Sequence, residues 1–492
     1  MSFSLENILM FGGILLLISV VSSKTSYRIG VPTLMLFIGV GMLAGSEGIG
    51  GIWFDDPTIA QFLGVIALNI ILFSGGMDTN WANIKPIWVK GVTLSTLGVL
   101  LTALCVGVFC YYAMGTFPLI ESLLLGATIS STDAASTFAI FRQKEAGLKH
   151  NLRPLLEFES GSNDPMAFFL TVSLISLIQN PESSWLMLIP KFFGGMIIGA
   201  LGGFVFGKLS VWFINRIRLD IDGLYPVMAM ALVFIAYTVT DAASGNGFLA
   251  VYIMGVILGN KTIVHKSSLM KFFDGISWLM QIVMFLTLGL LVFPSKMWEI
   301  AIPGIIISLF LIFIARPVAV LLCTLPWKMQ IRDRVFLSWC GLRGAVPIIF
   351  ATYPLVAGVP QATTIFNIVF FISLTSLLFQ GSTVFHCARL LGLVVPSKLK
   401  PHYFVHLADT YRSELREVVV TENSHVAGRQ ILEIKIPDSI LVVLIDRRGR
   451  FFSPRGSTRL ELGDKLYIIA ENPKQVEEFA QYVSLPLEAA AK

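Results

Sequence analysis

Long apolar stretches separated by short polar segments are the dominant pattern of this chain. A helix needs about 20 mostly apolar residues to cross the hydrocarbon core of a bilayer. Thirteen stretches reach or approach that length, and they cover residues 5–23, 31–46, 58–76, 87–112, 119–141, 154–178, 186–214, 223–241, 246–260, 271–293, 300–323, 335–356 and 362–387. The pattern therefore predicts an all-α polytopic membrane protein with about 13 transmembrane helices.

The loops between these stretches differ in charge, and this difference predicts their orientation. Alternate loops carry most of the basic residues, among them Lys85, Lys149 and Lys261. The intervening loops hold few basic residues and several acids, such as Glu47 and Asp55. Because Lys and Arg accumulate on the cytoplasmic side of a membrane, we expect the N-terminus outside and the C-terminus in the cytoplasm.

The composition changes after Pro396, where charged residues become frequent and short alternating runs replace the long apolar stretches. Alternation of apolar and polar residues predicts strands at 415–420, 441–446 and 465–470, with a turn at Arg448-Gly449. Residues 474–482 are typical of a short helix. The tail is therefore expected to form a small cytoplasmic α+β domain.

These patterns divide the chain into a transmembrane domain (1–395), a linker (396–409), a cytoplasmic domain (410–485) and a terminal segment (486–492). The terminal segment ends in Glu-Ala-Ala-Ala-Lys, which resembles an engineered helical linker. We therefore expect it to be an added tail, with the native chain extending further.

The composition agrees with a protein embedded in lipid. Hydrophobic residues make up 55% of the chain and charged residues only 14%, whereas a soluble domain carries about 25% charged residues. The mean hydropathy is +0.76. Membrane lipid is therefore the expected partner, and no nucleic-acid partner is expected.

Two polar pairs lie in one of the apolar stretches, in the run Glu159-Ser160-Gly161-Ser162-Asn163-Asp164. Residues four apart share a helix face, so Ser160 lies beside Asp164 and Glu159 lies beside Asn163. A carboxylate inside a bilayer is costly, and it usually marks an ion site or a proton relay. This run is the first candidate for a functional site.

Two other stretches contain polar interruptions. The fifth holds Ser130-Ser131-Thr132-Asp133, and the twelfth holds Gly341-Leu342-Arg343-Gly344 followed by a proline. Hydroxyl groups alone are compatible with ordinary helix packing, but an unpaired acid such as Asp133 is costly at that depth. In the twelfth stretch, two glycines and a proline around Arg343 favour an unwound helix. Interruptions in matching positions of two halves are typical of transporters with inverted repeats; here stretches one to six would match eight to thirteen.

Arg316 is a further charge inside a stretch, the eleventh. It either extends toward the membrane surface along its aliphatic stem or pairs with a buried acid, because a buried charge needs a partner. Glu159 is the candidate partner.

The chain resembles a monovalent cation/proton antiporter of the NhaP type. Four motifs carry the resemblance: Thr132-Asp133, the run from Glu159 to Asp164, Arg316 after an alanine, and Gly341-Leu342-Arg343-Gly344. The tail resembles a TrkA-C (RCK-C) domain, which is a regulatory domain of potassium uptake. The residues that carry this resemblance are Val426-Ala427-Gly428-Arg429 and Leu462-Gly463-Asp464-Lys465-Leu466.

The resemblance implies a role for each of these residues. Asp164 would carry the cation and the proton in turn, and Asp133, Ser160 and the Thr132 carbonyl would line the ion site at crossed, unwound helices of an NhaA-like fold. Asn163 would be held by Glu159 and Arg316. Arg343 would offset the carbonyl groups at the break. The resemblance also implies a homodimer in which a six-helix core moves against a static dimerisation region. One departure is visible: some members carry an acid where this chain has Ser74.

Elementary electrostatics predicts the same exchange. A carboxyl group in apolar surroundings favours its protonated form, and a nearby cation favours its charged form, so one carboxylate holds a proton or a cation in turn. The candidate ligands are all oxygens, which suit a hard cation. With the neutral Asn163 in place of a second acid, one proton per cation is expected, which makes the exchange electroneutral.

The regulatory-type tail favours K+ as the substrate over Na+, and no cofactor is expected. The tail has no G-x-G-x-x-G nucleotide fingerprint, so a regulatory ligand stays unidentified. The family and the charge pattern predict a bacterial inner membrane.

Three alternatives belong to other classes. A cation channel gated by the tail would be expected to carry a Thr-Val-Gly-Tyr-Gly type filter, which the sequence lacks. A sodium-coupled symporter for an organic solute would need a roomier site than this compact polar cluster. An enzyme would need a nucleophile beside a base, and none of the six histidines lies deep in an apolar stretch.

Overall fold

A computed structural model describes residues 5–29, 33–115, 117–144, 146–182, 184–217, 219–396, 415–421, 424, 426–434, 436–437, 440–447, 450–470 and 473–484. The chain forms two compact units, residues 1–397 and 398–492. Of the predicted features, the turn at 448–449, all of the linker except Pro396, and the terminal segment 486–492 lie outside the described residues.

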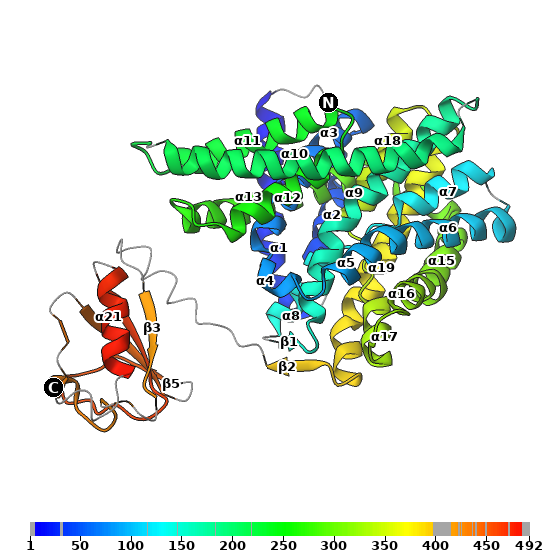
Figure 1. Cartoon of the computed structure of the whole chain (residues 1–492). Coiled ribbons are helices and arrows are strands. Elements are labelled where there is room, and N and C mark those ends of the chain that lie inside the picture. The colour runs from blue at the N-terminus through cyan, green and yellow to red at the C-terminus, as the bar shows by residue number, and fades with distance from the viewer. Residues whose placement is uncertain are drawn as a thin grey trace. The chain divides into compact units, whose positions relative to one another are not determined.

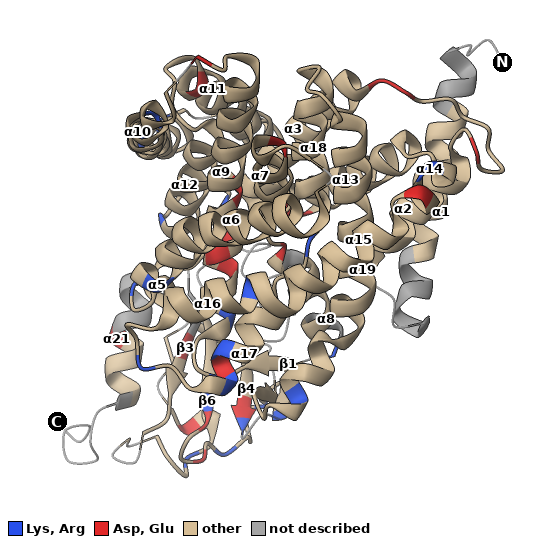
Figure 2. Ribbon diagram, turned by 90° about the vertical axis from the view of Figure 1, so that its right-hand side faces the viewer, with Lys and Arg blue, Asp and Glu red and all other residues tan. Residues whose placement is uncertain are grey.

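The first unit is a bundle of helices connected by short loops (Figure 1). Most of its ribbon carries no charged residue, as the tan helices of Figure 2 show. The helices are α1 (Leu5–Ile29), α2 (Thr33–Ala44), α3 (Pro57–Asp78), α4 (Trp81–Ile84), α5 (Trp88–Thr93), α6 (Val99–Phe109), α7 (Leu119–Thr128), α8 (Ala134–Gln143), α9 (Leu152–Gln179), α10 (Leu188–Arg216), α11 (Leu224–Ala242), α12 (Gly247–Asn260), α13 (Lys266–Leu291), α14 (Pro294–Glu299), α15 (Ala301–Phe310), α16 (Arg316–Thr324), α17 (Ile331–Trp339), α18 (Ala345–Val356) and α19 (Ala362–Leu390).

Every predicted apolar stretch contains a helix, which confirms the helical membrane fold. Among the described residues, eight helical stretches are long and apolar enough to cross a membrane by length and composition. Five shorter apolar helices occupy the remaining predicted stretches. The fifth and twelfth stretches are each broken into two helices, α7 with α8 and α17 with α18.

Three π-helical turns lie inside the fourth and eleventh stretches, and the sequence pattern did not predict them. They are η1 (Leu94–Gly98), η2 (Cys110–Met114) and η4 (Leu311–Ala315). Such turns are often found at functional sites because they shift the direction of the side chains that follow. Here η4 directly precedes Arg316, the charged residue of that stretch.

The helices pack in two groups. In one, α12 contacts α3 and α10, and α13 contacts α2 and α3; in the other, α7 contacts α6 and α9, and α19 contacts α15 and α18. The two groups meet where α3 packs on α18 and where α12 packs on α9. Both broken helices belong to the second group.

Small residues allow close approach within the first group. A Cβ atom added at Gly76 of α3 would lie 2.5 Å from the carbonyl oxygen of Tyr252 and 3.1 Å from the Cα atom of Gly255. The backbones of α3 and α12 therefore touch directly at this pair of glycines. Close backbone contact through small residues is the usual basis of helix association in lipid, where apolar burial adds little.

A two-stranded ribbon closes one end of the first unit. Strand β1 (Ala146–Leu148) follows α8 and pairs antiparallel with β2 (Val394–Pro396), which follows α19. The backbone N–H of Lys149 donates to the carbonyl of Leu393 (3.0 Å) and extends the pairing. Three-residue strands are too short to give a recognisable alternation, so the sequence did not predict this ribbon.

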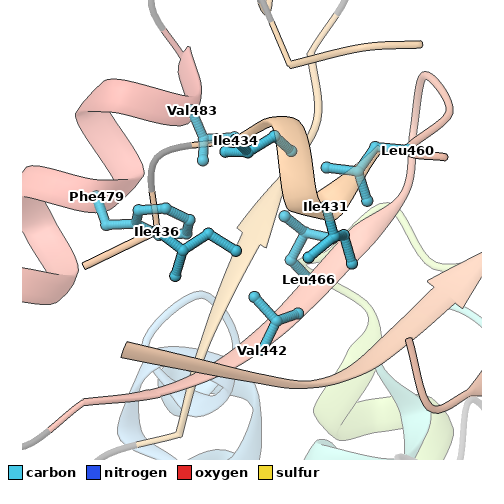
Figure 3. A pocket seen from close by; sticks show the side chains of 8 residues that line it. All are labelled: Ile431, Ile434, Ile436, Val442, Leu460, Leu466, Phe479 and Val483. Atoms are coloured by element: carbon cyan, nitrogen blue, oxygen red, sulfur yellow. The ribbon is translucent and has the colours of Figure 1, made fainter. Parts of the chain in front are cut away.

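The second unit is an antiparallel sheet in the order β3-β6-β4-β5. Its elements are β3 (Leu415–Val419), the short helix η5 (Ile431–Glu433), β4 (Ile440–Arg447), β5 (Arg450–Phe452), β6 (Lys465–Ala470) and α21 (Pro473–Ser484). The predicted strands and the terminal helix are therefore confirmed. Figure 3 shows an apolar pocket beside this sheet, lined by Ile431, Ile434, Ile436, Val442, Leu460, Leu466, Phe479 and Val483.

An ion pair with a buried carboxylate fixes the turn before β6. The Asp464 carboxylate is fully buried and accepts two bonds from Arg447, from Nε and from Nη2, each at 2.8 Å. This hydrogen bonding raises the pKa of Arg447. Gly463 precedes it with a φ of 84°, which suits glycine. The Gly-Asp pair before a strand is thus explained by its local geometry.

Candidate ion-binding site

The two broken helices meet at their breaks. Residues 129–133 separate α7 from α8, and residues 340–344 separate α17 from α18. The backbone N–H of Asp133 donates to the carbonyl of Leu342 at 2.8 Å, which joins one break to the other. The fold therefore has the crossed, unwound helices that the interruptions predicted.

Each break leaves the end of a helix inside the protein, and polar groups satisfy both ends. Arg343 is 1% exposed, and its Nη1 donates to the carbonyls of Ser130 (2.8 Å) and Ser131 (2.6 Å), just past the end of α7. The side chain Nε2 of Gln380 donates to the carbonyl of Trp339, the last residue of α17, at 3.0 Å. A cation at a helix C-terminus also complements the helix dipole, as expected for Arg343.

One carboxylate lies at both helix beginnings and caps the first of them. Asp133 precedes α8 and accepts from the backbone N–H (3.2 Å) and the hydroxyl (2.5 Å) of Ser136. Such an N-cap satisfies donors that the helix itself leaves unpaired. The same carboxylate lies against Gly344, which precedes α18: a Cβ atom there would collide with the Asp133 carboxylate. Only glycine leaves this space.

Helix α9 brings the candidate run against the first break. Asp164 is 5% exposed and accepts a hydrogen bond at Oδ1 from the Ser131 hydroxyl. The Ser160 hydroxyl donates to the Thr132 carbonyl (2.8 Å) and accepts from the backbone N–H of Ala134 (3.0 Å). The structure thus gathers Asp164, Ser160 and Thr132 at the break that also holds Asp133.

Asn163 has a different partner from the expected one. It is fully buried, and its Nδ2 donates to the Thr132 hydroxyl at 2.5 Å. Of the expected partners, Glu159 lies one turn earlier on α9 and Arg316 lies on α16. Asn163 therefore ties α9 to the break directly.

Arg316 and Glu159 form a buried ion pair. Arg316 Nη2 lies 2.5 Å from Glu159 Oε1, and the two side chains are 3% and 2% exposed. The pairing alternative for Arg316 is therefore correct and the surface alternative is wrong. Gly341 makes room for this arginine, because a Cβ atom at Gly341 would lie 3.0 Å from Arg316 Nε.

Sequence reasoning missed three polar residues of this region: Ser131, Ser376 and Gln380. Ser131 was visible in the hydroxyl run before Asp133, but its contact with Asp164 depends on how α9 crosses the break. Gln380 was an isolated amide in an apolar stretch, a signal comparable to Arg316. Ser376 lies one helical turn before it, and its hydroxyl donates to Gln380 Oε1 at 2.6 Å.

Two family models match the chain. The one described as "Sodium/hydrogen exchanger, transmembrane" matches residues 13–390, and the TrkA-C domain matches residues 415–484. The match of the second covers the strands and the helix of the small sheet domain.

Curated relatives and solved structures are also similar. The K(+)/H(+) antiporter NhaP of Alkalimonas amylolytica is 40% identical over 463 residues, which cover 93% of this chain and 80% of that protein. The K(+)/H(+) antiporter NhaP2 of Shewanella baltica is 38% identical over 491 residues, with 98% and 84% covered. The structure of the sodium proton antiporter MjNhaP1 from Methanocaldococcus jannaschii superposes with a TM-score of 0.68 at 22% identity, covering 78% of this chain and 98% of that one. This last likeness shows the fold.

The buried pair gives a prediction about stability. Glu159→Gln leaves the Arg316 charge buried without its partner, so we expect it to lower the free energy of unfolding by about 3–5 kcal/mol. The matched control is Glu157→Gln on the same helix, because Glu157 pairs with Arg153 at 2.8 Å where both side chains are exposed by 36% or more. The control should change the free energy by at most about 1 kcal/mol. Thermal unfolding in detergent measures both.

The double variant Glu159→Gln/Arg316→Met separates pairing from packing. It removes both charges, so it should recover most of the stability lost in Glu159→Gln. A double variant less stable than the single one would contradict the pairing.

Proposed function

The chain belongs to the sodium/hydrogen exchanger family and carries a TrkA-C domain, and we propose that it exchanges a monovalent cation for a proton through competition at Asp164. It is a transporter and not an enzyme, and it needs no cofactor. The observation that carries the proposal is the position of Asp164, a buried carboxylate at the crossing of two broken helices, bonded there by the Ser131 hydroxyl.

The oxygen atoms around Asp164 form the cation site. Asp164 and Asp133 contribute carboxylate oxygens, Ser160 a hydroxyl and Thr132 its backbone carbonyl. Hydroxyl and carbonyl oxygens have two lone pairs, so the Ser160–Thr132 hydrogen bond can stay in place while both oxygens face a cation. Hard monovalent cations prefer such an all-oxygen set.

The remaining polar residues support this site. Glu159 and Arg316 neutralise each other, and Arg343 holds the carbonyl groups of the first break. Asn163 keeps the Thr132 side chain in place. Because Glu159 and Arg316 compensate each other and Arg343 is held at backbone carbonyl groups, the charge that changes during the cycle is that of Asp164.

Alternating access requires one group of helices to move against the other. The group that contains the two breaks moves, and the group that contains α3, α10, α12 and α13 stays in place. The transporter is a homodimer whose subunits contact each other through the static group. The moving group carries the ion site across the membrane in an elevator-type movement. Asn246, the N-cap residue of α12, donates to the Pro165 carbonyl at 2.8 Å, next to Asp164. This bond joins the two groups, so it forms and breaks during each cycle.

The preferred cation is K+, with Na+ second. Support comes from the TrkA-C domain and from the two curated relatives described above, which are both named as K(+)/H(+) antiporters. The protein lies in a bacterial inner membrane with its N-terminus outside and its TrkA-C domain in the cytoplasm, as the basic loops indicate.

The TrkA-C domain regulates transport through the ribbon of β1 and β2. Strand β2 leads into the tail, whereas β1 directly follows α8, whose N-cap is Asp133. His150, just after β1, contacts the buried Asp333 of α17 (Nδ1 to Oδ1, 3.0 Å). The segment made of β1 and His150 thus follows α8 and contacts α17, which are one helix of each broken pair. The ligand that the domain senses is a small molecule or ion.

Loss of the Asp164 carboxylate tests the central residue. In proteoliposomes that contain a pH-sensitive dye, we expect K+ to reverse the quenching of the dye fluorescence at a lower concentration than Na+ does. Asp164→Asn should reduce the response to background, because an amide neither ionises nor exchanges a proton. Asp241→Asn, which changes an exposed acid at the end of α11, is the matched control and should keep its activity. Activity in Asp164→Asn would contradict the assignment, whereas a preference for Na+ would change the substrate alone.

The stoichiometry gives a second test. Exchange of one cation for one proton moves no net charge, so the initial rate should stay constant when a membrane potential is imposed on the vesicles. Net movement of one charge would instead couple the cycle to about 2.3 kcal/mol per 100 mV. A transport current on a solid-supported membrane that grows with the exchange rate would contradict electroneutral exchange.

The ribbon gives a test of regulation. Deleting residues 398–492 should change the rate or its pH profile. Because Lys149 and Leu393 form a hydrogen-bonded pair, alternation makes Gly147 and Val395 the next one. Val395→Pro removes that donor and should reproduce the effect of the deletion, while Val395→Ala should behave as wild type. Wild-type kinetics in the deletion would rule out regulation by the tail.

A further inference from the structure

A row of buried polar groups connects α19 to the second break. The amide of Gln380 donates from Nε2 to the carbonyl of Trp339 (3.0 Å), and its Oε1 accepts from the Ser376 hydroxyl (2.6 Å). The Ser376 oxygen in turn accepts from the backbone N–H of Arg343 at 2.9 Å. Ser376 and Gln380 are each 1% exposed. These two side chains therefore bridge the break from the end of α17 to Arg343.

The same row continues to the candidate ion site. Arg343 Nη1 donates to the Ser131 carbonyl at 2.6 Å, and the Ser131 hydroxyl donates to Asp164 Oδ1. A continuous series of hydrogen bonds thus runs from an unbroken helix of 29 residues to the carboxylate. None of the proposed cation ligands belongs to α19.

We propose that Ser376 and Gln380 are positioning residues of the ion site, which they control through Arg343 and Ser131. This inference rests on the proposed function. Neither side chain touches the cation; together they set where the backbone of residues 340–344 lies, and hence where the Arg343 guanidinium meets the other break.

The physical reason is that unwound backbone has no regular ladder to fix it. The Arg343 N–H and the Trp339 carbonyl are both held by side chains of α19. A buried donor without a partner costs about 1–3 kcal/mol, so loss of the Ser376 oxygen favours a shifted backbone that finds another partner. A shift of about 1 Å in a binding site lowers its effectiveness steeply.

A purely structural role predicts a different outcome. If Ser376 and Gln380 only stabilise the fold, their loss reduces the amount of folded transporter and leaves its KM for the cation unchanged. The KM does not depend on how much protein is active. It therefore separates positioning from folding.

The experiment measures KM and maximal rate for K+ in proteoliposomes of the full chain. Ser376→Ala and Gln380→Leu should each raise the KM about 10-fold, as loss of an outer-shell partner does at other ion sites. Ser376→Thr keeps a hydroxyl, so its KM should stay close to that of wild type and well below that of Ser376→Ala. The matched control is Ser382→Ala on the same helix, because Ser382 is exposed and, within the part of the chain that the structure describes, its hydroxyl donates to the carbonyls of Leu378 (2.6 Å) and Phe379 (3.2 Å) of its own helix.

The double variant Ser376→Ala/Gln380→Leu should raise the KM no further than the more severe single variant, since both residues act along one series of bonds. Wild-type KM in both single variants would overturn the inference while leaving the proposed exchange intact. An equal rise in Ser382→Ala would overturn it as well. If wild type does not exchange K+ or Na+ for protons, the proposed function fails, and the inference fails with it.

Discussion

Four helix ends lie inside the membrane unit of this protein, and the need to satisfy their backbone groups governs the rest of the site. A bilayer offers no water to unpaired N–H and C=O groups, so broken helices persist only where protein groups replace it. Arg343 and Gln380 serve the two ends, and Asp133 lies at the two beginnings. Glycine at 344 is required by the same arrangement, because any side chain there would displace the carboxylate.

In the proposed exchange, this constraint separates the charges that support the structure from the charge that changes. Glu159 and Arg316 neutralise each other, and Arg343 is directed at backbone carbonyls. Asp164 differs from these groups: among the described residues it has a hydroxyl partner and no ion pair. A carboxylate with a neutral partner keeps the freedom to take up a proton or a cation, whereas one fixed by an arginine would favour its charged form throughout.

The sequence predicted the features that follow directly from the order of apolar and charged residues along the chain. Hydropathy located the helices, and the cost of an isolated buried charge led from Arg316 to Glu159. The partner of Asn163 was not predictable in this way, because a neutral amide can bond to either neighbour and the crossing decides which. The π turns and the β1–β2 ribbon were missed for another reason: they are a few residues long and leave no periodic pattern. Gln380 was overlooked although a lone amide in an apolar stretch carries the same signal as a lone charge, only weaker.

In the proposed exchange, the hydroxyl group beside Asp164 allows the hydrogen bonding to change although the backbone around the site is fixed. The backbone at both breaks is fixed by bonds that do not involve Asp164, so its ligands cannot rearrange freely. A serine hydroxyl can donate to a charged carboxylate and accept from a protonated one by rotating a single bond, which a carbonyl or a guanidinium cannot do. Ser131 occupies that position. In the proposed mechanism, the switch between proton and cation then requires reorientation of a hydrogen atom at the site, and the two groups of helices make the larger movement.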